Sequence, residues 1–216
     1  MFNGLRETIR AYKLRDPAAK SGIEIFLLYP GIHAYISYKL AHWLYRRRRY
    51  FLARAVSQWS RFVTGIEIHP GAVIGRRLVI DHGTGIIIGE TAELGDDVLL
   101  YQGVTLGGTG KDTGKRHPTI GNNVLIGAGA KVLGPFKVGD NSRIAAGAVV
   151  LKEIPPDSTA VGVPARVVRV AGVRPDFASE LDQVNMADPV AIELSAVREQ
   201  LDVLEKKLLE LESNKS

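Results

Sequence analysis

Two short stretches of the sequence carry side chains that could do chemistry. His82 stands between Asp81 and Gly83, and histidine is the side chain whose ordinary pKa best suits proton uptake and release near neutral pH. Further along, Arg116 and His117 lie in a glycine-rich polar stretch, and a guanidinium can hold a carboxylate through two parallel hydrogen bonds. The structural alternatives are a histidine that only serves a turn and a solvated loop arginine. On residue type alone, both alternatives stay open.

The composition narrows the possible chemistry. The chain of 216 residues has no cysteine, which excludes disulfides, thiolate zinc sites and a cysteine nucleophile. Apolar residues make up 45 %, enough for a packed core. The formal charge of +5 suits an anionic partner, which could be nucleic acid, a membrane surface or a phosphorylated cofactor. Composition does not choose among these three.

The sequence shows no pattern typical of a targeting or membrane-spanning segment. The N-terminus is charged throughout and lacks an apolar signal core, and no apolar stretch approaches the ~20 residues needed to span a bilayer. We expect a soluble, cytoplasmic protein without a membrane partner. The basic run at 46–49 has no aromatic platform or binding motif beside it. It is interpreted as a solvated helix end, and no nucleic-acid partner is expected.

A six-residue period organises the middle of the chain. Residues 65–172 hold 20 of the 23 glycines. Aliphatic residues recur every six positions in three runs of constant phase: Ile68, Ile74 and Ile80; Ile88, Leu94, Leu100 and Leu106; Ile120, Ile126, Val132, Val138, Ile144 and Val150. This pattern predicts a three-sided parallel β-solenoid with one inward aliphatic per short strand and three repeats per coil. Gly75, Gly89, Gly95, Gly121, Gly127 and Gly139 follow inward residues, where a corner needs little or no side chain.

Two breaks interrupt the period. One, around residues 86–88, is a slip of only two residues. The other holds a polar, glycine-rich stretch that we interpret as a loop extruded from the solenoid over residues 107–119. Long loops in compact folds are usually functional or mobile.

The flanking segments differ from the solenoid. Residues 1–64 have apolar residues at three- and four-residue spacing, which predicts helices. Asp16 is expected to be a helix N-cap, with Pro17 at the first helical position, and Pro30 to begin another helix. Residues 169–216 form a tail with a leucine stripe that predicts a helix near 189–212. The fold class is therefore α+β: a helical domain at 1–64, a solenoid at 65–168 and a helical C-terminal tail.

Several motifs give the chain a family resemblance. They include IDHGTGIIIGETA (80–92), VTLGGTGK (104–111), KRHPTIG (115–121) and AVGVPAR (160–166), together with RDPAA (15–19) in the helical segment. The solenoid resembles the left-handed parallel β-helix of the hexapeptide acyltransferases, and within that superfamily nearly the whole chain resembles the serine O-acetyltransferases. The left hand is implied by the resemblance and not by the spacing. The implied activity is acetyl transfer from acetyl-CoA to the hydroxyl of L-serine, the first step of cysteine biosynthesis from serine.

The resemblance also implies roles for particular residues. His82 matches the general base, and Glu67 matches the position of its carboxylate partner, where the family commonly has aspartate. The longer glutamate side chain is a departure from the family pattern. Asp16 and Asp81 match the positions that hold the serine ammonium, although Asp16 as a mere cap is an equal alternative. Arg116 and His117 match those that hold the carboxylate.

The co-substrate is expected to lie along the groove between neighbouring solenoids. Gly108, Ala128 and Ala146 match family positions where small residues let the pantetheine arm approach the backbone. The backbone of Gly107 and Gly108 could donate an N–H to the thioester oxygen. Arg143 is a candidate for the phosphate end, with a solvated basic face as the alternative. No metal is expected.

Competing functions and further partners follow from the same resemblance. The alternatives are a hexapeptide acetyltransferase acting on a sugar or antibiotic, a metalloenzyme of the γ-carbonic-anhydrase kind, which needs three histidine ligands, and a non-enzymatic scaffold. The family implies a homotrimer or a dimer of trimers, with sites between protomers, and feedback inhibition by L-cysteine. A complex with O-acetylserine sulfhydrylase is uncertain, because the chain ends in Ser216 and not in isoleucine.

Overall fold

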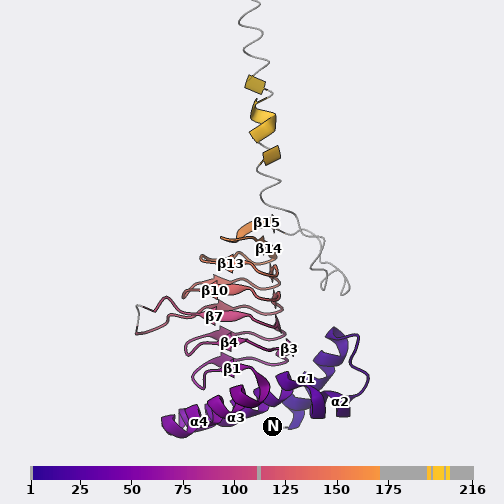
Figure 1. Ribbon diagram of the computed structural model, residues 1–216, viewed down its shortest axis with the longest axis vertical. Helices are drawn as coiled ribbons and strands as arrows, with labels where there is room; N and C mark the ends of the chain where they lie inside the picture. Colours follow the sequence, from indigo (N-terminus) through magenta and orange to yellow (C-terminus); the bar gives the residue numbers. More distant parts are fainter. Residues whose placement is uncertain (1, 111–112, 171–193, 196, 202, 205–216) are drawn as a thin grey trace, which may run out of the picture.

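The computed structural model describes residues 2–110, 113–170, 194, 195, 197–201, 203 and 204, and begins with helices that lie under a tapering stack of strands (Figure 1). The helices are α1 (Phe2–Arg15), α2 (Gly22–Leu28), α3 (Pro30–Arg46) and α4 (Tyr50–Thr64). Helix α2 begins with a capping box between Ser21 and Glu24. Helix α3 begins at Pro30, as predicted.

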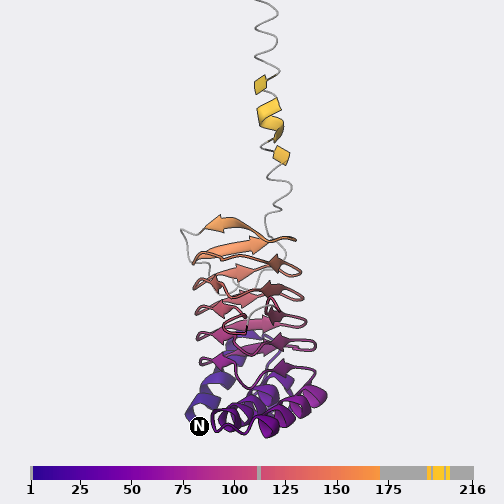
Figure 2. The same cartoon turned by 90° about the vertical axis from the view of Figure 1, so that its left-hand side faces the viewer.

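The strands form three parallel faces of a prism, which we name sheets A, B and C. Sheet A consists of β1 (Glu67–Ile68), β4 (Ile87–Ile88), β7 (Thr105–Gly107), β10 (Lys131–Leu133) and β13 (Val149–Val150). Sheet B consists of β2 (Val73–Ile74), β5 (Glu93–Leu94), β8 (Thr119–Ile120) and β11 (Lys137–Val138). Sheet C consists of β3 (Val79–Asp81), β6 (Leu99–Tyr101), β9 (Leu125–Ile126), β12 (Arg143–Ile144), β14 (Ser158–Val161) and β15 (Arg166–Val170). The chain passes from A to B to C once per coil, so each strand pairs with the strand one coil later (Figure 2).

The predicted six-residue period is confirmed by burial. All the aliphatic residues of the three runs point into the prism, where each is at most 7 % exposed. They stack along the three sheets, as Ile68, Ile88, Leu106, Val132 and Val150 do in sheet A. This confirms the fold class, a helical segment followed by a parallel β-helix.

The structure adds a second inward position that the period alone did not reveal. The residue two positions before a periodic aliphatic is also buried at nearly every repeat, as Ile66, Ala72 and Leu78 are in the first coil; Phe136 is only partly buried. In later coils most of these sites hold alanine or valine. Two inward residues per repeat, one large and one often small, fill the prism.

The predicted corner glycines lie where the next coil approaches. A Cβ atom on Gly95 would lie 2.9 Å from the backbone of Gly121, and one on Gly127 would lie 2.6 Å from the nitrogen of Ala146. A side chain at these positions would push adjacent coils apart. This confirms the reason for which the sequence pattern requires glycine.

The helices close the lower end of the solenoid. The first coil has no coil beneath it, so its backbone polar groups need other partners. Side chains of the helices supply several of them. The Tyr12 hydroxyl accepts the N–H of Ile80 at 3.0 Å. The carbonyls of Ile68, Pro70 and Ala72 accept hydrogen bonds from Ser57 (2.7 Å), His42 (2.8 Å) and Tyr38 (2.7 Å).

Helix α4 packs through small residues. Ala53, Ser57, Ser60 and Thr64 face inward, whereas large apolar residues of the periodic stripe face outward, such as Phe51 at 84 % and Trp59 at 67 % exposure. The predicted helix is therefore present, but its aromatic face does not cover the solenoid.

The upper end of the solenoid is closed differently. Strand β15 pairs antiparallel with β14 and ends the parallel stack. Beyond it, residues 194–195, 197–201 and 203–204 are helical, in agreement with the helix predicted near 189–212. The rest of that prediction lies outside the described residues. No helix among the described residues is long and apolar enough to cross a membrane.

One local prediction is wrong. Asp16 does not cap a helix N-terminus, because α1 ends at Arg15 and the next helix begins only at Gly22, with Ser21 as its cap. The Asp16 carboxylate instead accepts the N–H of Ala18 at 2.8 Å in the connecting turn. Proline at position 17 is therefore a turn residue.

Replacing Tyr12 by Phe is expected to lower the free energy of unfolding by about 1–3 kcal/mol, because the buried N–H of Ile80 loses its acceptor. Urea unfolding measures this value. Tyr50→Phe is the control, because Tyr50 is 53 % exposed. Equal stability of the two variants would contradict the capping role of Tyr12.

Candidate functional site

The candidate residues fall on the edges of the prism where the chain turns from one sheet to the next. We name these the CA edge (between sheets C and A), the AB edge and the BC edge. His82 and Asp81 lie on the CA edge, at the end of β3. Arg116 and His117 lie on the AB edge, before β8. In Figure 1, β3 and the loop that follows β7 extend to opposite sides of sheet A.

The two-residue slip in the period is the place where His82 protrudes. The corresponding turn in the next coil consists of two residues, Gln102-Gly103, whereas this one has His82 and Gly83 inserted before the equivalent Thr84-Gly85. His82 takes a left-handed conformation with φ of 59°, which is uncommon for a side chain other than glycine. Its side chain is 78 % exposed. The insertion therefore lifts the imidazole off the prism.

One carboxylate, that of Asp81, lies beside this histidine, and a second, that of Asp16, lies near Asp81. Oδ1 of Asp81 is 3.9 Å from Nε2 of His82. Burial raises the pKa of Asp81; the charge of nearby Asp16 raises it further, whereas His82 opposes the shift. Asp16 accepts a hydrogen bond of 2.6 Å from the Tyr29 hydroxyl, and this bond raises the pKa of Tyr29 to about 12. Crowded carboxylates of this kind favour binding of a cation.

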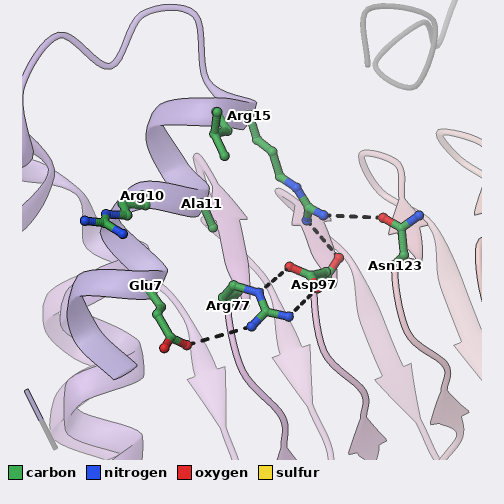
Figure 3. Close-up of a pocket in the computed structure, with 8 residues that line it drawn as sticks. Glu7, Arg10, Ala11, Arg15, Arg77, Asp97 and Asn123 are labelled. Atoms are coloured by element: carbon green, nitrogen blue, oxygen red, sulfur yellow. Dashed lines mark hydrogen bonds and ion pairs between the residues drawn. The ribbon is translucent and has the colours of Figure 1, made fainter. Parts of the chain in front are cut away.

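Helix α1 is fixed at its end by the BC edge, and this places Asp16. Nη1 of Arg15 donates to the carbonyl of Asp97 at 2.8 Å, and Nη2 reaches Oδ1 of Asn123 at 3.5 Å (Figure 3). Arg77 pairs with Asp97 and with Glu7 of α1 in the same open pocket. The charges of this pocket are used to anchor the helix.

On the AB edge, Arg116 is held by a carboxylate that sequence reasoning did not select. Nη2 of Arg116 donates to Oε2 of Glu90, and the other oxygen of Glu90 accepts the Tyr45 hydroxyl of α3 at 3.0 Å. The guanidinium holds the pKa of Glu90 below its usual range. Helix α3 is thereby connected to the end of the extruded loop.

Thr91 holds the end of the extruded loop, residues 115–117, through hydrogen bonds. Its hydroxyl accepts the N–H groups of Arg116 at 3.0 Å and of His117 at 3.1 Å, and its carbonyl accepts Nζ of Lys115 at 2.8 Å. Desolvation and the charges of Arg116 and Lys115 lower the pKa of the buried His117, against the effect of Glu90. Glu90 and Thr91 lie within the IDHGTGIIIGETA motif. That placement was the available sign of their role.

Glu67 does not contact His82 in the described part of the chain. Its carboxylate lies 3.2 Å from Arg61 and 3.7 Å from Arg54, both on α4, and its side chain is 19 % exposed. The carboxylate within ion-pair distance of His82 is that of Asp81. The expected orienting role of Glu67 thus has no counterpart within a single chain.

The expected co-substrate positions divide between the edges. Ala128 and Ala146 lie on the CA edge above His82, and the N–H of Gly147 bonds to the carbonyl of Ala128. Arg143 lies in β12, just before that edge. Gly107 and Gly108 lie on the AB edge; a Cβ on Gly108 would lie 3.1 Å from Arg116. The small residues on the CA edge leave its backbone open to a close ligand.

A single chain therefore brings together two partial sets. Asp16, Asp81 and His82 form one, and Arg116 and His117, with the unpredicted Glu90 and Thr91, form the other. Within residues 2–110 and 113–170, no hydrogen bond or ion pair joins the two sets. No group of three or more histidine, aspartate or glutamate side chains suited to a metal occurs among the described residues.

Comparison with known proteins gives one consistent family. Residues 117–152 match the model of the bacterial transferase hexapeptide (six repeats). The serine acetyltransferase of Synechococcus elongatus is 50 % identical over 96 % of this chain and 84 % of its own. That of Bacillus subtilis is 52 % identical over 96 % of this chain and 94 % of its own.

Solved structures agree. A serine acetyltransferase in complex with cysteine has a TM-score of 0.81 at 40 % identity, over 85 % of this chain and 71 % of that one. The Brucella abortus enzyme in complex with coenzyme A has a TM-score of 0.78 at 46 % identity, over 80 % and 69 %. The Neisseria gonorrhoeae enzyme in complex with serine has a TM-score of 0.75 at 41 % identity, over 78 % and 69 %.

Replacing Asp16 by Asn is expected to lower the pKa of Asp81, because one of the two crowded charges is removed while burial stays. The amide oxygen of asparagine can still accept the N–H of Ala18, and its NH₂ group can donate to the Tyr29 hydroxyl. Carboxyl ¹³C NMR titration measures the shift, with the exposed Glu153→Gln as control. An unchanged pKa of Asp81 in the Asp16 variant would show that the two carboxylates are not coupled.

Proposed function

The chain belongs to the serine acetyltransferase family, and we propose that it transfers the acetyl group of acetyl-CoA to the hydroxyl of L-serine, giving O-acetyl-L-serine and CoA. The observation that carries the proposal is the match of about half of all residues over nearly the whole length of curated relatives. The two partial sets on the CA and AB edges supply the acid–base and charge-binding groups that such a reaction needs.

The proposed reaction is direct attack in a ternary complex. His82 takes the proton of the serine hydroxyl as its oxygen bonds to the thioester carbon. An N–H of the Gly107-Gly108 backbone stabilises the developing oxyanion. The carbon–sulfur bond then breaks, and the proton on His82 passes to the departing sulfur of CoA. The exposed, left-handed position of His82 supports this role, because the imidazole is free to meet both substrates.

The amino-acid substrate is held at its two charged ends. The carboxylates of Asp16 and Asp81 bind the ammonium, and their mutual crowding favours a cation. Arg116 and His117 bind the carboxylate. The pKa of Asp81 is raised, so Asp81 becomes protonated and neutral at a higher pH than an ordinary aspartate does. As the pH falls through this pKa, serine binding weakens because the ammonium loses one of its two charged partners.

Each complete site is proposed to lie between two copies of the chain. The two sets lie on different edges of one prism with sheet A between them, so a neighbouring prism in a homotrimer can place its AB edge against the CA edge. The same contact is the proposed place for Glu67 to approach His82. A dimer of trimers is the larger alternative.

The pantetheine arm of acetyl-CoA is proposed to lie along the CA edge, over Ala128 and Ala146, with Arg143 near the phosphates. The coenzyme A complex of the Brucella abortus relative supports this co-substrate. No metal is assigned to the reaction.

The proposed setting is the cytoplasm, as the first step of cysteine biosynthesis. L-cysteine is the proposed feedback inhibitor, since it shares the charged ends of serine and a relative is known in complex with cysteine.

Thiol release from acetyl-CoA tests the activity. We expect release that requires L-serine and that falls by at least ~10²-fold in His82→Ala. His33→Gln is the matched control, because His33 only bonds to the carbonyl of Phe26. Release driven by a sugar acceptor and not by serine would favour the sugar acetyltransferase instead, and full activity of His82→Ala would remove His82 from the mechanism.

Mixing two inactive variants tests the shared site. One copy carries His82→Ala, and the other carries both Arg116→Gln and His117→Gln. Random trimers are expected to regain about one quarter of wild-type activity, because one interface in four joins two intact edges. Mixed oligomers without activity would show that the site does not form between copies.

A further inference from the structure

His117 has an unusual hydrogen-bonding environment at its Nδ1 atom. The backbone N–H of Thr91 points at Nδ1, at 3.2 Å, and the Thr91 hydroxyl oxygen lies 2.9 Å from the same atom. A backbone N–H can only donate. Nδ1 must therefore present its lone pair, and a neutral His117 must carry its proton on Nε2.

The hydroxyl of Thr91 leads to the same conclusion. Its oxygen already accepts the N–H groups of Arg116 and His117, which uses its two acceptor positions. Its own hydrogen is left to donate, and Nδ1 of His117 is the acceptor within reach. The N–H and the hydroxyl of Thr91 both find their acceptor at Nδ1 in one tautomer only. A proton on Nδ1 would oppose the N–H of Thr91 and leave the hydroxyl hydrogen without its acceptor.

The Nε2 side of the His117 imidazole is also closely surrounded. His117 is buried, and a Cβ on Gly89 would lie 2.1 Å from Nε2, so only glycine leaves room for the ring. A Cβ on Gly108 would lie 3.3 Å from Nε2. Nε2 therefore lies next to the Gly107-Gly108 backbone of the AB edge.

The charged surroundings oppose a second proton on the ring. Arg116 and Lys115 on its own loop disfavour the imidazolium, as does desolvation, whereas Glu90 favours it. His69, from the turn after β1, also interacts with His117. The net direction is a lowered pKa, in agreement with the hydrogen-bond geometry.

We propose that Thr91 is a positioning residue that fixes His117 as the neutral Nε2–H tautomer, so that His117 offers a hydrogen-bond donor at the AB edge and cannot act as a base. Its effect on turnover rests on the proposed function, whereas the tautomer itself does not. The proposal separates the two histidines of the site. His82, exposed on the CA edge, takes the proton, while His117 donates to a substrate oxygen.

The tautomer is tested by long-range ¹H–¹⁵N NMR of ¹⁵N-histidine-labelled enzyme, with His117 assigned by comparison with His117→Gln. The wild type is expected to show the Nε2–H pattern at pH 8, where the ring is neutral because its pKa lies below the ordinary value. Thr91→Ser is expected to keep this pattern. Thr91→Val keeps the backbone N–H but loses the hydroxyl, one of the two donors at Nδ1, so the preference for Nε2–H is expected to weaken: a fraction of the Nδ1–H form appears and the pKa of His117 rises. A wild-type Nδ1–H pattern, or a Thr91→Val spectrum like the wild type, would overturn the proposal.

Turnover gives the second measurement. Thr91→Val is expected to raise KM for serine about tenfold with a smaller change in kcat, as loss of one or two hydrogen bonds predicts, and Thr91→Ser is expected to restore it. Thr159→Val in β14 is the matched control for loss of a threonine hydroxyl away from the site. If Thr91→Val alters the NMR pattern but leaves KM for serine unchanged, the link to substrate binding is wrong. If the wild type releases no thiol with serine, the proposed function fails while the tautomer result stands.

Discussion

The open lower end of the solenoid is the constraint on which the rest of the structure depends. A parallel coil satisfies its backbone only between two others, so the first coil needs partners from elsewhere. Tyr12, Tyr38, His42 and Ser57 provide them. The same contacts bring α1 against β3, and Tyr12 bonds to the residue directly before Asp81. The contacts that close the end of the prism therefore also hold α1 where its following residue, Asp16, lies near Asp81.

Much of the fold could be predicted from a single periodicity. Ile68, Ile88 and Leu106 are buried one above another because a six-residue repeat leaves the backbone little choice once glycine marks the corners. The pattern was less informative for the helices. The apolar stripe of α4 predicted a helix but not its orientation, since Ser57 and Thr64 face inward while Phe51 faces solvent. A stripe shows periodicity, whereas the packing partner determines which face is buried. Asp16 was misplaced for a similar reason, because Asp-Pro occurs both in turns and at helix starts.

The candidate site was predictable where chemistry and motif coincide. His82, Asp81, Arg116 and His117 have residue types that suggest their roles, and family resemblance supplied the rest. Glu90 and Thr91 were missed because their contacts join residues 26 positions apart across the loop, as in the bond from Thr91 to His117. No local pattern shows such a contact. For Glu67 the family motif implied a contact with His82. Within one chain, its carboxylate instead forms ion pairs with Arg54 and Arg61.

The coils are stacked at a regular spacing, so the turns along the CA edge lie at fixed distances from one another. Successive turns at Thr84, Gln102, Ala128 and Ala146 are joined by one backbone hydrogen bond each, and neighbouring strands lie about 4.8 Å apart. Three steps thus separate the turn of His82 from Ala146, or roughly 14 Å. If the pantetheine arm lies along this edge as proposed, its reach is set in steps of one coil, and a chain with one coil more or fewer would accept a tail longer or shorter by one step while His82 stayed in place.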